Sequence, residues 1–160
     1  MTTSTDLSNR LHEVFINGTW IANTNYTQQL TDINIVQANC KLPQLNTIAL
    51  ITYHINYYVA GLIQILQGGK LTISDTYSWA MPPINTEAEW QLLLTTLTTN
   101  AAKFVNLVAQ LPNNILLQPF TEPQYGTYLR NIEGVLEHSY YHLGQVVLIK
   151  KLVIENLKKV

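Results

Sequence analysis

Charge and cysteine are scarce in this sequence, and each shortage excludes a class of function. Charged residues make up 12% of the 160 residues, and nine basic against ten acidic side chains give a net charge of -1. Without an excess of positive charge, nothing in the composition supports binding to nucleic acid, whose phosphates attract basic surfaces. Cys40 is the only cysteine, which excludes an intramolecular disulfide and fits a reducing compartment. Expected partners are small molecules or protein chains.

Signals for secretion and for membrane insertion are also weak. The stretch "MTTSTDLSNRLHEVF" lacks a basic segment followed by an apolar one, so we expect a cytoplasmic protein. Residues 47–66, "TIALITYHINYYVAGLIQIL", contain no charge over about the length of a membrane span. However, four polar side chains interrupt this run: Thr52, His54, Asn56 and Gln64. We therefore expect a buried helix of a soluble protein and no membrane span.

Hydrophobic residues, 47% of the chain, recur mainly at helical spacing, and no internal repeat is visible. The length suits one domain over residues 1–160. We predict an all-α protein, most simply a four-helix bundle. A short strand within residues 115–120 is compatible with this class. The predicted long helices cover residues 6–16, 47–67, 86–111 and 127–158, with a shorter helical stretch at 26–31 and a loop across one end at 70–85.

Capping residues mark the ends of these helices. Thr86 followed by Glu89 forms a capping box, and Thr127 is the expected cap of the last helix. Either Ser4 or Thr5 is expected to cap the first helix. The second helix should stop at the pair of glycines that begins at Gly68.

His138 and His142 lie four residues apart in the last helix, one turn apart on the same face. At 100° per residue, this face also carries Val135, Val146 and Ile149, so both imidazoles should point into the core. His54 shares a face with apolar residues of the second long helix. A buried imidazole needs a hydrogen-bond partner or a metal ion, because an unsatisfied polar group costs about 1–3 kcal/mol.

Three inward histidines on two helices match the three-ligand sites that leave a coordination position open. Nitrogen ligands suit Zn, Ni, Fe or Cu. Ser139 stands where the helical protease motif needs glutamate, and no glutamate lies three residues before a histidine, as di-iron bundles require. His12 and Glu137 are expected at the surface. A metal-free alternative stays open, in which the histidines bond to tyrosines and backbone.

Two segments also resemble a known family. These are "NTIALITYHINYYVAGLIQILQGG", residues 46–69, and "NIEGVLEHSYYHLGQ", residues 131–145. The sequence resembles the DinB-like, or YfiT-like, metalloenzyme superfamily, within a bacterial branch. The resemblance implies a four-helix bundle with a long crossover, often a homodimer. It also implies a divalent metal, such as Zn, Ni or Fe, held by His54, His138 and His142. Relatives include S-transferases and isomerases that use low-molecular-weight thiols, and some have been proposed as hydrolases.

Side chains near the predicted ion bear on the reaction. No carboxylate shares the histidine faces, and Asp75 in the loop is the one candidate base, which favours thiol transfer over hydrolysis. A metal-binding bundle without catalysis remains an alternative. Candidates to orient the histidines or a small-molecule substrate are Tyr57, Tyr58, Asn131, Tyr141 and Gln145.

The helices that carry the histidines are apolar on their rear faces too. A helix that is apolar all round is buried on both sides. We therefore expect the rear faces to form a homodimer interface or to be covered by long loops. The residues concerned are Ile55, Val59, Ile63 and Leu66 in one helix, and Ile132, Leu136, Leu143, Val147 and Ile154 in the other.

Overall fold

A computed structural model describes residues 2–158 of the chain, and the described part is all-α, as predicted. Residues 1, 159 and 160 lie outside this description, and the single domain expected over residues 1–160 stays a prediction. Within residues 2–158 no strand forms, and one isolated bridge joins Pro119 to Thr127. The helices are α1 (Ser4–His12), α2 (Tyr26–Leu30), α3 (Ile35–Ala38), α4 (Ile48–Leu66), α5 (Glu87–Gln110) and α6 (Tyr128–Leu157).

Local capping explains where the helices begin. The Thr86 and Glu89 capping box opens α5, and the Thr127 side chain accepts from the backbone of α6, both as predicted. The cap of α1 was predicted one or two residues too late. Thr3 caps it, because Asp6 stands three residues further on and completes a capping box. Gly68 ends α4 with a φ of 82°, a conformation that favours glycine.

Two segments between the long helices contain short helices. The passage between the predicted stretch at 26–31 and Pro43 contains the short helix α3, which Asn34 caps. The strand allowed within 115–120 does not form. Residues Asn113–Leu117 instead make a 3₁₀ helix.

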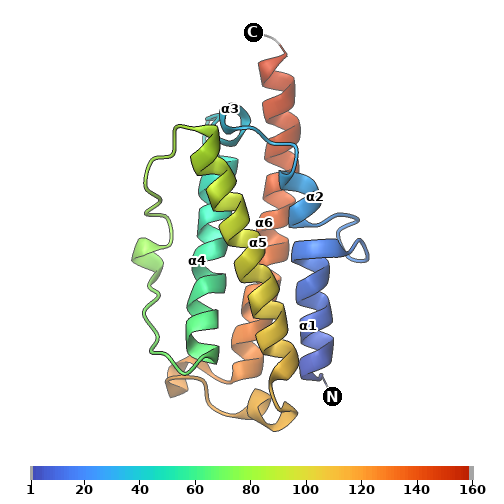
Figure 1. The fold of residues 1–160 in the computed structure, drawn as a ribbon, viewed down its shortest axis with the longest axis vertical. Helices are drawn as coiled ribbons and strands as arrows, with labels where there is room; N and C mark the ends of the chain where they lie inside the picture. The colour runs from blue at the N-terminus through green and yellow to red at the C-terminus, as the bar shows by residue number, and fades with distance from the viewer. Residues whose placement is uncertain (1, 159–160) are drawn as a thin grey trace.

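The four longest helices lie side by side, and α6 extends beyond the others at its C-terminal end (Figure 1). Helix α4 contacts both α5 and α6, while α1 contacts α5 and α6. The core between them includes Trp90, whose side chain is fully buried and donates to the Ile33 carbonyl oxygen at 2.6 Å.

Helices α4 and α5 run in the same direction, so the chain between them must return along the whole molecule (Figure 1). This crossover segment, residues 67–86, follows the outer side of α4 instead of lying across one end as predicted. Its course is antiparallel to α4, since Thr72 bonds Gln64 and Ser78 bonds His54. A single 3₁₀ turn at Asp75–Tyr77 interrupts it.

The apolar rear faces of α4 and α6 are covered by the chain's own helices. On α4, Ile55, Val59 and Ile63 are buried, and α5 packs against that helix. Contacts from α1 and α2 cover α6, where Ile132, Leu136 and Leu143 are buried and Val147 and Ile154 are half-buried. The expectation that these faces form a subunit interface was therefore wrong for their buried residues, and the connecting segments Glu13–Asn17 and Asn113–Leu117 also contact α6. Each of these helices packs against several neighbours in the same chain, so it can be apolar on more than one side without a second subunit.

By length and composition, both α4 and α5 could cross a membrane, a test that core helices of soluble proteins also pass. In α4, 61% of the apolar window is buried inside the protein, which fits a core helix. The corresponding share for α5 is 28%.

Candidate metal centre

Three imidazoles converge between α4 and α6. His54 comes from α4, while His138 and His142 come from consecutive turns of α6. The Nε2 atom of His138 lies 3.2 Å from Nε2 of His54 and 2.9 Å from Nε2 of His142. The three nitrogens that face one another all lie within 4.8 Å. The structure therefore brings together the three histidines that the sequence singled out, and they could hold a metal ion.

The outer nitrogens of two of these rings are already bonded. His54 Nδ1 lies 3.1 Å from the backbone oxygen of Ser78, and His142 Nδ1 lies 2.6 Å from Oε1 of Gln145. A carbonyl oxygen can only accept a hydrogen bond, so each Nδ1 carries the proton and donates. In a neutral ring the proton is then absent from Nε2, which directs a lone pair at the shared centre.

A cation resolves the crowding of these lone pairs. Neutral His138 can place at most one proton on Nε2 and can donate it to one neighbour only. At least one pair of Nε2 lone pairs would otherwise face each other in a buried site. Ligand nitrogens at about 2.0–2.1 Å from one ion are about 3.0–3.4 Å apart, and two of the three Nε2 separations, 3.2 Å and 2.9 Å, are close to this. The donor set and its spacing thus fit a divalent ion.

The electrostatics of the site keep the rings neutral. Burial lowers the pKa of all three imidazoles below the ordinary value of 6.5. The pKa of His138 falls furthest, to about 4, because the charges of His142 and His54 add to burial. At neutral pH the lone pairs are therefore available to a metal ion.

Aromatic side chains enclose the cluster. Trp79 stacks on the ring of His54, with ring centroids 3.6 Å apart and planes within 9°. Tyr58 meets His54 and His138 edge to face, each at 5.1 Å. Sequence reasoning missed Trp79 and the Ser78 carbonyl, because loop residues follow no helical period. One signal could have indicated Trp79: it is an aromatic residue in a long loop, and long loops are often functional.

The five residues expected around the site divide into two groups. Gln145 bonds His142, Tyr58 packs against two imidazoles, and Tyr141 meets the ring of His142 edge to face at 4.9 Å while staying 64% exposed.

The remaining two expected residues do not touch the imidazoles. Tyr57 OH donates to the backbone oxygen of Ser74, and the Asn131 amide donates to the backbone oxygens of Tyr125 and Thr127. Asn131 nevertheless lines a cavity that reaches His138. His12 and Glu137 are exposed, as predicted.

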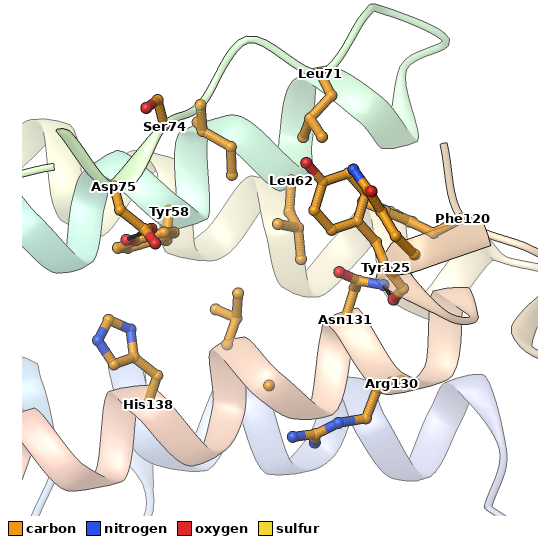
Figure 2. A pocket seen from close by; sticks show the side chains of 14 residues that line it. Tyr58, Leu62, Leu71, Ser74, Asp75, Phe120, Tyr125, Arg130, Asn131 and His138 are labelled. Atoms are coloured by element: carbon orange, nitrogen blue, oxygen red, sulfur yellow. Dashed lines mark hydrogen bonds between the residues drawn. The ribbon is translucent and has the colours of Figure 1, made fainter. Parts of the chain in front are cut away.

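A carboxylate faces the cluster from the crossover segment. Asp75 and His138 line the same cavity of about 940 Å³, and Figure 2 shows both at one end of it with Tyr58. Tyr58 OH donates to Asp75 Oδ1 at 2.6 Å. Burial, and then this bond to Asp75, raise the pKa of Tyr58 above its ordinary value of 10. The sequence placed no carboxylate on the histidine faces, and the fold supplies one from a different element.

Comparison of the chain with protein-family models, curated proteins and solved structures gave no match. The resemblance to the DinB-like superfamily therefore stays a prediction. What the site can do has to be argued from its own geometry.

Proposed function

We propose that this protein is a divalent-metal-dependent enzyme of the DinB-like superfamily, with the ion held by His54, His138 and His142. The observation that carries the proposal is the convergence of three Nε2 atoms, two of them on rings whose Nδ1 atoms donate to carbonyl oxygens. Zn, Ni or Fe fits this nitrogen donor set.

We propose that the architecture is the four-helix bundle of that superfamily, built from α1, α4, α5 and α6. Two features support this topology. The four helices are the longest of the described residues, and they pack in the order α1, α5, α4, α6 with α6 closing on α1. The crossover segment is the long connection that the resemblance implies (Figure 1).

Thiol transfer is the reaction that we place first. A bound divalent ion lowers the pKa of a thiol or water that it binds. Asp75 would accept the proton that is released, and Tyr58 holds that carboxylate through its hydroxyl. The cavity beside His138 is large enough for a small electrophile next to a thiol.

Hydrolysis is the second candidate. The sequence argued against it because no carboxylate shares the histidine faces, but the position of Asp75 supplies a carboxylate beside the site. A carboxylate held beside the site by Tyr58 could take a proton from water as readily as from a thiol. Both reactions therefore use the same pair of residues and differ in the nucleophile.

Metal analysis of untagged protein tests the binding site. We expect about one Zn or Ni per chain after saturation and dialysis, and loss of most of it in His54→Ala. The matched control is His12→Ala, which removes an exposed imidazole outside the cluster. Less than about 0.2 ion per chain, with no difference between the variants, would reject the site and favour a metal-free interaction module.

Turnover assays separate catalysis from metal binding alone. The metal-loaded protein is tested with small thiols plus electrophiles, and with esters and amides in the absence of thiol. We expect Tyr58→Phe and Asp75→Asn to reduce turnover about 10²-fold or more while metal content stays unchanged. The control is Tyr57→Phe, which loses only the bonds to Ser74. Metal binding without turnover in any assay would reject the enzyme proposal and support a metal-binding bundle without catalysis.

A homodimer and a cytoplasmic location remain part of the proposal. Any dimer must use a surface other than the buried rear faces. Exposed Tyr141, Leu148 and Leu152 on α6 are spaced by whole helical turns and offer such a surface. Sedimentation equilibrium at micromolar concentration tests it, and a strictly monomeric species would contradict the dimer. One half-buried cysteine without a disulfide fits a reducing compartment.

A further inference from the structure

The cavity beside the histidines is long and has unlike ends. Figure 2 shows Asp75, Tyr58 and His138 at one end, and Phe120, Tyr125 and Asn131 at the other. Asn131 and His138 are seven residues apart on α6, which corresponds to about 10 Å along the helix axis. A ligand that touches both ends must therefore be elongated.

Apolar side chains line the cavity between its ends. Leu62 of α4 and Val135 of α6 are buried, and Leu71 and Ile73 of the crossover segment face the same space. In Figure 2 the labelled Leu62 lies between the two polar ends. An apolar chain or ring would be removed from water here, which favours its binding roughly in proportion to the buried area.

Few charged side chains line the cavity. Of the described lining residues, only Asp75 and Arg130 carry a full charge at neutral pH. Arg130 pairs with Glu137 at 3.0 Å, and its guanidinium points away from the cavity (Figure 2). The Asp75 carboxylate lies at the end of the cavity where the histidines would hold a divalent cation, and that cation would attract an anionic head group there.

We propose that the cavity binds an elongated small molecule whose apolar middle lies along α6 and whose reactive end lies at the three histidines. The position of the reactive end rests on the proposed function. The contacts of the apolar part involve protein side chains only and can be tested without a metal.

Gly134 makes this proposal testable by one substitution. It lines the cavity one turn before His138, and a Cβ atom built on it meets nothing within 4 Å. A leucine there would extend into the space without displacing the core. Gly144 is the matched control, since it lies on the same helix, is equally free of neighbours and does not line the cavity. Both substitutions replace a glycine inside a helix and should favour folding.

The experiment measures binding of alkyl hydroxamic acids of increasing chain length by calorimetry, from acetohydroxamic to octanohydroxamic acid. These probes share a hydroxamic acid head, which loses its proton when it binds a metal ion, and they differ only in the tail. We expect affinity for the Co(II)-loaded protein to rise about twofold per methylene, about sixtyfold over the six methylenes of the series, because the open cavity buries each methylene partly. Gly134→Leu should remove this rise but keep the binding of acetohydroxamic acid, and Gly144→Leu should keep both.

The same series on metal-free protein separates the two proposals. If the metal site fails, affinity should still rise with chain length in the wild type and not in Gly134→Leu, which would support the cavity and reject the metal. If the Co(II) spectrum responds to the head group but affinity is independent of chain length, the cavity proposal is overturned and the metal site stands. Equal dependence on chain length in wild type and Gly134→Leu would also overturn it.

Discussion

Replacing Gln145 by alanine should weaken metal binding without removing a ligand. Gln145 Oε1 accepts the Nδ1 proton of His142 at 2.6 Å, which fixes both the rotation of the ring and the nitrogen that carries the lone pair. The corresponding partner of His54 is a backbone oxygen that mutation cannot delete. Loss of such an outer partner lowers metal affinity about 10–100-fold, or about 1.4–2.7 kcal/mol.

Competition with a chromophoric chelator for Zn at neutral pH measures this effect. Gln145→Glu keeps an acceptor for the Nδ1 proton, so its affinity should equal or exceed that of the wild type. Gln91→Ala, at an exposed position of α5, controls for the loss of an amide side chain. A Zn affinity for Gln145→Ala within about twofold of the wild type would refute the role assigned to this bond.

Three further changes probe the site and its surroundings. The pKa of His138 is about 4 in the folded protein and 6.5 ordinarily, so the unfolded chain binds more protons between these values. Metal-free protein should therefore lose on the order of 2 kcal/mol as pH falls from about 6.5 to 4, seen in urea midpoints, and a flat profile would contradict this. Gly61→Ala makes a methyl carbon overlap with Ile73 Cγ2, so the free energy of unfolding should drop by about 1 kcal/mol although alanine favours the helix more than glycine does. A gain in that free energy would contradict the packing of Ile73 against Gly61. Trp79→Ala uncovers His54, and Zn release to excess chelator should be several-fold faster at unchanged stoichiometry; an unchanged rate would show that the indole does not shield the ion.

Much of the fold could be predicted because the signals are local. The caps Thr86 and Thr127 act on backbone groups within three residues, and the histidine faces follow from the helical period alone. The error at α1 was also local, since Asp6 was not recognised as the partner of Thr3. Predictions that needed only neighbouring residues were therefore either correct or misplaced by one or two residues.

Predictions that depended on what packs against a face were less successful. Periodicity indicated correctly that Leu136 and Val59 are buried, but it could not say by what. Both lie against helices of the same chain, so the argument for a subunit interface on those faces fails. Periodicity records only that a side chain leaves water, and any apolar surface satisfies that condition.

By itself the sequence determined the helices and the inward direction of His54, His138 and His142, because the direction of a side chain on a helix follows from its position in the helical period. Only the tertiary structure decided what surrounds them. The crossover segment returns along α4 and brings the Ser78 carbonyl to His54, with Asp75 beside Tyr58. Ser78 lies 24 residues from His54 in a segment without helical period, so its position depends on the parallel course of α4 and α5 (Figure 1).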